Sequence, residues 1–415
     1  MPAGVLVAAP DGMPTASAPA RAVAKPDGEA PDEVEHETDG DTETNPQDQE
    51  GGESCLLSLQ ERHFSREAVL SALKTCGGYA LRHAGKFYAD REVCQAAVTE
   101  HGTSLRYVHE DLRADRDIVL AAVDNDGLAL EHAAAELRED HEIVMTAVKQ
   151  NGMALAHAGS SLCANQQIVL AAVDNDGMAI KHAGLELKDD PLVVKAAVRQ
   201  NGMALAWVAS DFRGDQPTVL AAVAQDGYAL EYGARHLRSD RDFMLLAVKQ
   251  SGLALLYASD ELRADYGVVL SAVKRTGRSL EFASSDLRGD REIVLAAAEQ
   301  DPSSVYYAAE EVKASEEFVL AAMQLDRGHE TLQYAAMPLR CSRRLMLAAI
   351  ALDGRAIRHA PALLLNDQTF LAEAMSTNGA ALVSLAPERQ TFDLAVAAVA
   401  SLVSVNGHRP RSKAY

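Results

Sequence analysis

Three histidines at a fixed spacing are the residues whose type most directly suggests chemistry. His132, His157 and His182 follow one another at 25-residue intervals, and His83 and His359 take the same place in other units of the pattern. Imidazole nitrogen is a common zinc ligand, so the row first suggests a metal site. Equivalent side chains of stacked helical units lie ~8–10 Å apart, however, whereas zinc holds each nitrogen at ~2.0–2.1 Å. One ion cannot join two units of this row, and we predict neither a metal nor a cofactor.

A second candidate is the turn Asp-Asn-Asp-Gly, which recurs at 124–127 and 174–177. Carboxylate and amide oxygens bind calcium, but an EF-hand loop needs a fuller set of ligands that ends in a glutamate. Ala122 and Ala172 stand where a further acidic ligand would be needed. Asp and Asn are common before glycine for local backbone reasons. We therefore predict a turn and no calcium site.

Aromatic side chains occupy the histidine position in most other units, at Tyr107, Trp207, Tyr232, Tyr257, Phe282, Tyr307 and Tyr334. A basic residue follows the last apolar residue of most units, at Arg113, Arg138, Lys188, Arg213, Arg238, Arg263, Arg288, Lys313 and Arg340. Proteins that bind single-stranded RNA combine such side chains, but a net charge of −21 opposes affinity for phosphates. Single-stranded RNA is therefore the alternative partner. Each basic side chain can instead serve the end of its own helix or a nearby acid.

Apolar residues stand four positions before many of the histidines and aromatics. On an α-helix, residues four apart share a face, so the two positions together predict a second apolar stripe. This stripe either packs between adjacent units or lines an exposed groove, where methionine and aromatic residues are typical of partner binding. The candidate partner-binding residues are Met153, His157, Met178, His182, Met203, Trp207, Tyr232 and Tyr257.

Signatures of catalysis are lacking in the sequence. It contains no glycine-rich phosphate loop and no HExxH motif, and no Ser/His/Asp or Cys/His set stands out. The five cysteines, Cys55, Cys76, Cys94, Cys163 and Cys341, are scattered and form no CxxC pair. They indicate reduced thiols of an intracellular protein. We predict a non-enzymatic protein.

The elements that position these residues are best seen in the unit that starts at Asp115. Asp115 is typical of a helix N-cap, and the apolar run from Ile118 to Val123 predicts a helix buried on a wide arc. Gly127 is expected to end this helix in the left-handed conformation. A second helix is expected to end near Leu137-Arg138, where the arginine favours the negative end of the helix dipole.

Residues that cap helices recur through the chain in this register. They are Ser65, Asp90, Asp115, Asp140, Asn165, Asp190, Asp215, Asp240, Asp265, Asp290, Ser315, Ser342 and Asp367. A fixed period of this length predicts a solenoid, so the fold class is an all-α solenoid of about thirteen 25-residue two-helix repeats. Departures occur at Gly77-Gly78, at Pro302 and at 327–329, and the pattern loosens from about residue 301.

A longer period of 50 residues is also visible, because the Asp-Asn-Asp-Gly turns alternate with Lys149-Gln150-Asn151-Gly152 and Arg199-Gln200-Asn201-Gly202. The pattern DREIVLAAV…DG.AL.(Y/H)A…LR.D resembles the bacterial and protist repeat family named domain of unknown function 4116, over Ser65 to Leu339. The resemblance implies an all-helical repeat whose unit spans two helix pairs. It implies no activity, ligand or catalytic residue.

Composition divides the chain into four segments. Residues 1–53 carry 13 acidic and 2 basic residues and few large apolar ones, which predicts a disordered acidic tail over 1–54. The solenoid is expected over 55–390, a C-terminal capping helix over 391–407 and a short basic tail over 408–415. No secretory signal and no apolar run of ~20 residues is present, so we expect a cytoplasmic protein, with a transit peptide as the alternative for the N-terminus.

These observations together favour a repeat scaffold that binds a protein or peptide partner along the aromatic and methionine stripe. The acidic balance makes nucleic acid an unlikely partner on physical grounds, and no segment predicts insertion into a membrane. The identity of the partner does not follow from the residues.

Overall fold

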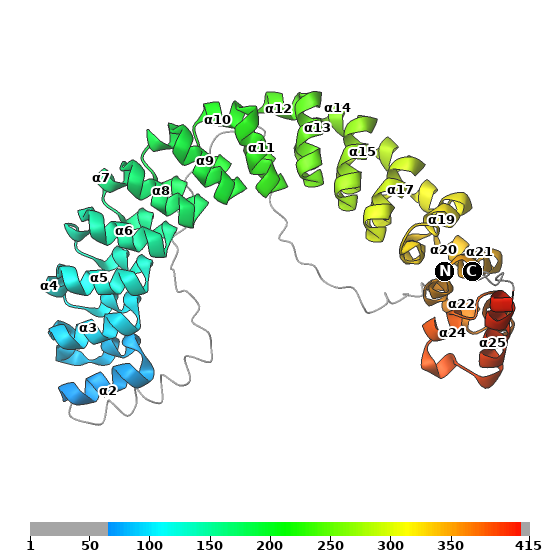
Figure 1. Ribbon diagram of the computed structural model, residues 1–415, viewed down its shortest axis with the longest axis horizontal. Helices are drawn as coiled ribbons and strands as arrows, with labels where there is room; N and C mark the ends of the chain where they lie inside the picture. Colours follow the sequence, from blue (N-terminus) through cyan, green and yellow to red (C-terminus); the bar gives the residue numbers. More distant parts are fainter. Residues whose placement is uncertain (1–64, 408–415) are drawn as a thin grey trace, which may run out of the picture. The chain divides into compact units, whose positions relative to one another are not determined.

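The computed structural model describes residues 65–407, and within this range every regular element is a helix (Figure 1). A regular unit has three pieces, here shown by the unit that starts after Asp115. They are a ten-residue α-helix, α5 (Arg116–Asn125), a six-residue 3-10 helix, η4 (Gly127–His132), and a short third piece, η5 (Leu137–Glu139). The next unit repeats this order with α6 (His141–Gln150), η6 (Gly152–His157) and α7 (Ser160–Cys163).

The same three pieces recur along the chain. The other long α-helices are α2 (Arg66–Cys76), α3 (Arg91–Glu100), α8 (Gln166–Asn175), α9 (Pro191–Gln200), α11 (Gln216–Gln225), α13 (Arg241–Gln250), α15 (Tyr266–Arg275), α17 (Arg291–Gln300), α19 (Glu316–Ala322), α21 (Arg343–Leu352), α23 (Gln368–Thr377) and α25 (Phe392–Gly407). The other 3-10 helices that follow them are η1 (Gly78–His83), η3 (Gly102–Tyr107), η7 (Gly177–His182), η9 (Gly202–Trp207), η10 (Gly227–Tyr232), η11 (Gly252–Tyr257), η12 (Gly277–Phe282), η13 (Pro302–Tyr307), η14 (Gly328–Tyr334) and η15 (Gly354–His359). The remaining third pieces are η2 (Gly85–Ala89), α4 (Glu110–Arg113), η8 (Leu187–Asp189), α10 (Ser210–Gly214), α12 (Arg235–Ser239), α14 (Asp260–Arg263), α16 (Ser285–Arg288), α18 (Glu310–Lys313), α20 (Met337–Arg340) and α22 (Ala362–Leu365), and α24 (Ala381–Ser384) and η16 (Pro387–Arg389) precede α25.

The predicted helix caps are confirmed at all thirteen positions. In each case the side chain of the cap residue accepts a hydrogen bond from a backbone N–H in the first turn of the following helix. Asp115, for example, accepts from the N–H groups of Asp117 and Ile118. These bonds satisfy donors that have no partner inside the helix.

Units pack in sequence, and their contact forms one continuous core. Each long α-helix lies against the next long α-helix, and each of the 3-10 helices η1 to η15 that follow a long α-helix lies against the next one in that series. In the unit of α5, the side chains of Ile118, Val119 and Val123 are fully buried, as is Leu130 of η4. One unit alone has no partner for these faces, so stability comes from the contact between neighbours.

The expectation of a second α-helix in each unit is wrong. After His132 the backbone becomes extended at Ala133, and the N–H of Ala134 donates to the carbonyl of Arg113 in the preceding unit at 3.0 Å. A continuous α-helix would use these backbone groups internally. The hydrogen bond between units therefore replaces a turn of helix, and it recurs where Gly159 donates to Arg138 at 2.8 Å.

The expected left-handed conformation of Gly127 is also wrong. Among the described glycines, positive φ is confined to Gly77 and Gly85. A Cβ atom on Gly127 would instead lie 2.4 Å from the carbonyl oxygen of Ala147 in the next unit, and on Gly152 it would lie 2.3 Å from that of Ala172. The close approach of neighbouring units, and not the local backbone, requires glycine here.

Three predicted segments lie wholly or partly outside the described residues. They are the acidic tail 1–54, the first ten residues of the predicted solenoid 55–390, and the basic tail 408–415. Helix α25 falls within the predicted range 391–407. Between residues 65 and 407, no helix combines the length and the apolar character that crossing a bilayer requires.

Candidate interaction face of the 3-10 helices

The eight predicted partner-binding residues lie on five consecutive 3-10 helices, η6, η7, η9, η10 and η11. Met153, Met178 and Met203 take the second position of their helices, and His157, His182, Trp207, Tyr232 and Tyr257 take the sixth. We call these eight residues the 3-10 row. All eight are half-buried, neither enclosed in the core nor fully open to solvent.

The 3-10 geometry changes how the two positions relate. Residues three apart eclipse in a 3-10 helix, so residues four apart differ by about 120°. Met153 and His157 therefore do not share one helix face. The prediction that they do, which assumed α-helical spacing, is wrong. His157 lines up instead with Ala154, which is fully buried. The sixth position consequently lies at the edge of the core, where Trp207 and Tyr232 pack against buried residues.

Side chains at the sixth position contact the fifth position of the preceding unit. The Nζ atom of Lys181 lies 5.0 Å from the centroid of the Trp207 ring, within range of a cation–π interaction. The hydroxyl of Tyr257 donates to Glu231 Oε2 at 3.1 Å. These two fifth-position residues are 50 residues apart, so the contacts lie two units apart along the row.

His157 and His182 are held neutral. Burial lowers the pKa of His157, and Arg138 lowers it further against the opposing effect of Glu131. Burial likewise lowers the pKa of His182, with Lys181 acting in the same direction. At neutral pH each imidazole thus offers one donor and one acceptor. The row is accordingly an apolar surface with a few polar atoms.

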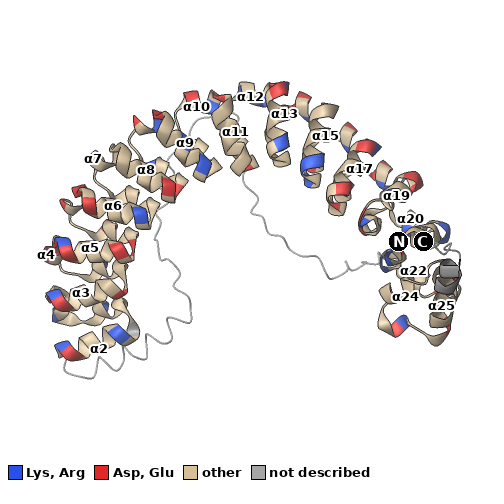
Figure 2. Ribbon diagram, in the orientation of Figure 1, with Lys and Arg blue, Asp and Glu red and all other residues tan. Residues whose placement is uncertain are grey.

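Arg113, one of the basic residues that follow the units, serves the end of the 3-10 helix η3. Arg113 donates from Nε to the carbonyl of Val108 at 2.7 Å and from Nη2 to that of Arg106 at 2.9 Å. The Nε atom of Arg138 is buried without a hydrogen-bond partner, and burial lowers the pKa of Arg238. Figure 2 shows basic and acidic segments interspersed along the described helices. Arg113 and Arg138 are therefore both partly buried within their units.

The Asp-Asn-Asp-Gly turn holds units together. The amide of Asn125 donates to the carbonyl of Thr99 at 3.0 Å and accepts from the N–H of Gly102 at 2.8 Å, both in the preceding unit. Asp126 accepts from the N–H of Leu128 at 3.0 Å and so caps η4. The part of the chain that the structure describes contains no group of three or more His, Cys, Asp or Glu placed to hold a metal ion.

These bridges between units were not predicted from the sequence, although the residues that form them recur in register. An amide residue ends the long helix at Asn125, Gln150, Asn175 and Gln200. Each of the four makes the same pair of hydrogen bonds to the unit before it, and we call these pairs the amide bridges. The recurrence of Asn or Gln at the last position of these four long helices was the signal in the sequence.

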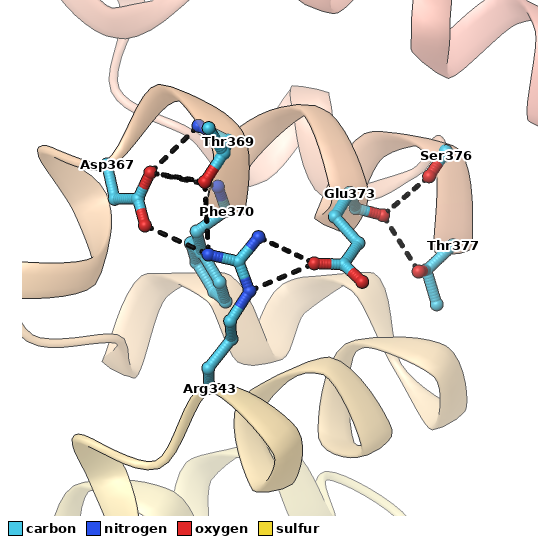
Figure 3. A network of polar contacts seen from close by, with 7 residues as sticks. All are labelled: Arg343, Asp367, Thr369, Phe370, Glu373, Ser376 and Thr377. Carbon is cyan, nitrogen blue, oxygen red and sulfur yellow. Dashed lines mark hydrogen bonds and ion pairs between the residues drawn. The ribbon is translucent and has the colours of Figure 1, made fainter.

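Ion pairs link the starts of neighbouring long helices. Arg91 bonds the cap residue Asp115 of the next unit through Nε at 3.1 Å. Figure 3 shows the fullest example, in which Arg343 reaches Asp367 at 2.9 Å and Glu373 at 2.6 Å, tying α21 to α23. These side chains are 24–54% exposed, and ion pairs open to solvent contribute little individually. Their regular recurrence fixes the register between units.

Comparison with known proteins identifies one family. The profile described as Domain of unknown function (DUF4116) matches residues 65–113, 115–163, 165–213, 218–263, 265–313 and 290–340. Most matches span two of the units described above, in agreement with the 50-residue period. No curated protein and no solved structure matches the chain.

Proposed function

We propose that this chain, which belongs to the family of domain of unknown function 4116, is an α-solenoid scaffold that binds an extended segment of a partner protein along the 3-10 row. The role requires no catalysis. Repeat proteins use such continuous surfaces for binding, since each unit adds one set of contacts. The observation that carries the proposal is the run of eight half-buried methionine, imidazole and aromatic side chains over five consecutive units.

The chemistry of the row suits a peptide. Methionine adapts its shape to a partner, while Trp207 and Tyr232 present large faces that are already fixed by contact with the core. Side chains ordered before binding lose little conformational entropy when a partner arrives. Leu128 and Tyr228, second-position residues that are 36% and 37% exposed, extend the same surface.

The partner we favour is an apolar peptide segment with occasional hydrogen-bonding groups. Neutral His157 and His182 can exchange one hydrogen bond each with such a segment. A strongly anionic partner is disfavoured, because Glu131 and Glu231 stand next to the row. The same carboxylates oppose binding of RNA.

Separate measurements of peptide binding and RNA binding test the proposal. The full chain is screened against a library of random 12-residue peptides, and against a 20-nucleotide oligouridine at low and moderate salt. We expect enriched apolar peptides whose affinity changes little with salt. Binding of oligouridine that falls steeply with salt would favour RNA instead, because phosphate contacts release counterions.

Trp207→Ala supplies the matched variant. On a binding surface, truncation of an aromatic anchor weakens the enriched peptides by ~2–4 kcal/mol. It should also lower stability much less than truncation of a fully buried side chain does, because Trp207 is only half-buried against the core. If the row only packs, the change costs ~3–5 kcal/mol of stability, and the single tryptophan resists acrylamide quenching. Leu205→Ala is the control for core packing, because Leu205 is fully buried in the same 3-10 helix.

A further inference from the structure

The last described helix, α25, carries an apolar face that no other part of residues 65–407 covers. Phe392 is 82% exposed, Val396 54% and Val399 59%. The three residues are spaced at i, i+4 and i+7, and so lie on one side of the helix. From 392 to 405 the sequence contains one charged residue, Asp393. Helices that are apolar on all sides are normally buried.

The register of the repeat shows that Val399 belongs to a contact between units. The hydroxyl of Thr391 accepts from the N–H of Leu394 at 3.5 Å, which places Thr391 in the cap position of α25. Val399 is then the eighth residue after the cap, the place taken by Met375 in α23 and by Val123 in α5. Both of those residues are fully buried.

Neighbouring elements account for this burial in regular units. The eighth position of a long helix lies in the layer between that helix, its own 3-10 helix and the next unit. Helix α25 packs against α23 in the same way as earlier helices pack on one another. No 3-10 helix follows it among the described residues. Among residues 65–407, the outer side of α25 therefore lacks the neighbour that covers the eighth position in regular units.

The opposite end of the described chain has a different character. Helix α2 exposes Arg66, Glu67, Ser71 and Lys74, while its large apolar residues are buried or half-buried. A head-to-tail contact would thus place the apolar face of α25 against a polar one. A contact between two copies of α25 matches apolar residues with apolar residues and closes at two subunits.

We propose that α25 is a dimerisation face, and that a second copy of this chain packs on Phe392, Val396 and Val399 across a two-fold axis. The face is one helix wide and so falls below the ~800 Å² per partner of a standard stable interface. The dimer is consequently weak and forms reversibly with concentration. This inference is independent of what the 3-10 row binds.

Sedimentation velocity of the full chain over about 1–100 μM tests the proposal. We expect the mass to rise from monomer to dimer across this range. The double variant Phe392→Glu/Val399→Glu should raise the dissociation constant by about 100-fold or more, since like charges would meet across the axis. Leu185→Glu is the matched control, because Leu185 is 84% exposed on a different unit, and it should leave the dimer intact.

Two outcomes overturn the inference. One is a wild-type chain that stays monomeric at every concentration. The other is a dimer that persists in the double variant, or that Leu185→Glu abolishes equally, because self-association would then use another surface. Circular dichroism of each variant establishes that it is folded, which the exposed positions of all three residues lead us to expect.

Discussion

Gly127 and Gly328 both begin a 3-10 helix against a neighbouring long helix, but the chain enters them differently. At Gly127 the long helix runs its full ten residues, and the glycine N–H donates to Gln150 of the next unit at 2.6 Å. At Gly328 helix α19 has seven residues, and the glycine N–H donates to Leu325 of its own loop at 3.0 Å. The irregular boundary therefore lacks the bridge between units that the regular one has.

No other interaction at Gly328 among the described residues replaces the missing hydrogen bond between units, and two further features destabilise this boundary. Arg327 takes the left-handed conformation, with φ of 58°, which is unfavourable for a residue with a side chain. His329 is buried, and its Nδ1 atom has no hydrogen-bond partner although Asp353 Oδ2 lies 3.3 Å away. Two inserted residues thus cost one hydrogen bond between units, one strained backbone position and one unsatisfied polar atom. The boundary at Gly328 combines these three weaknesses, and we expect the stack to open first near residues 322–353.

The largest effect is expected from placing a side chain at a regular boundary. In Gly127→Ala the new Cβ would lie 2.4 Å from the carbonyl of Ala147, so the two units must move apart. We expect a loss of about 3 kcal/mol, at the upper end for overpacking. Thermal melting measures the loss, and hydrogen exchange should locate the opening in the units of α5 and α6.

Gly214→Ala is the control for this prediction. The nearest atom to a Cβ at Gly214 is 3.4 Å away and belongs to the side chain of His236. The glycine ends the short helix α10, where alanine is preferred by roughly 0.5–1 kcal/mol. Equal destabilisation by the two variants would show that contact between units is not what selects Gly127.

Loss of an amide bridge comes next in size. Asn175→Ala leaves the buried N–H of Gly152 without an acceptor, which should cost about 1–3 kcal/mol. Gln225 occupies the same place at the end of α11, but its side chain makes no amide bridge. Gln225→Ala should therefore change stability by less than about 0.5 kcal/mol. Urea unfolding compares the two, and similar losses would argue against the bridge as a source of stability.

The first half of each unit could be predicted well from the sequence, and the second half only poorly. The caps and the buried positions of the long helices follow from local rules, because N-cap chemistry and apolar spacing are visible in a single unit. The 3-10 helices and the role of Gly127 depend on backbone groups of the adjacent unit, as when Ala134 bonds Arg113. Such pairings between units have no signature in local propensity. The residues of the 3-10 row could be identified from their repeated positions in the sequence. Their half-buried state could not, because it depends on the 3-10 geometry.

A smaller effect is expected from removing one cap. Asp115→Ala deletes two hydrogen bonds to backbone N–H groups and the ion pair with Arg91, and should cost about 1 kcal/mol. Because units contact only their neighbours, hydrogen exchange should rise in the unit of α5 and in the adjoining units of α3 and α6, and in no others. A uniform rise from 65 to 407 would contradict the repeat-by-repeat account of stability.

The cap carboxylates also predict a dependence on acid. Partial burial raises the pKa of Asp115, but hydrogen bonds from Arg91 and the N–H of Ile118 outweigh it, and the net pKa is lowered. The stabilisation is therefore present above the unfolded pKa of about 3.9 and is lost as pH falls through the folded value. Melting of wild type should drop below about pH 4, and the Asp115→Ala variant should lose part of that drop.

The smallest effect is expected from the three consecutive histidines of the register, because their side chains are half open to water. Burial lowers the pKa of His132, His157 and His182 in the folded state. A lowered histidine pKa favours the neutral form, so its contribution is complete above the unfolded value of about 6.5 and is lost as pH falls through the folded value. Replacing all three by tyrosine, which other units carry at this position, should flatten the decline in melting temperature below about pH 6.5 without altering the acid transition of the caps. A triple variant whose decline matched that of wild type would place the titrating groups elsewhere, with buried His329 at the irregular boundary the next to test.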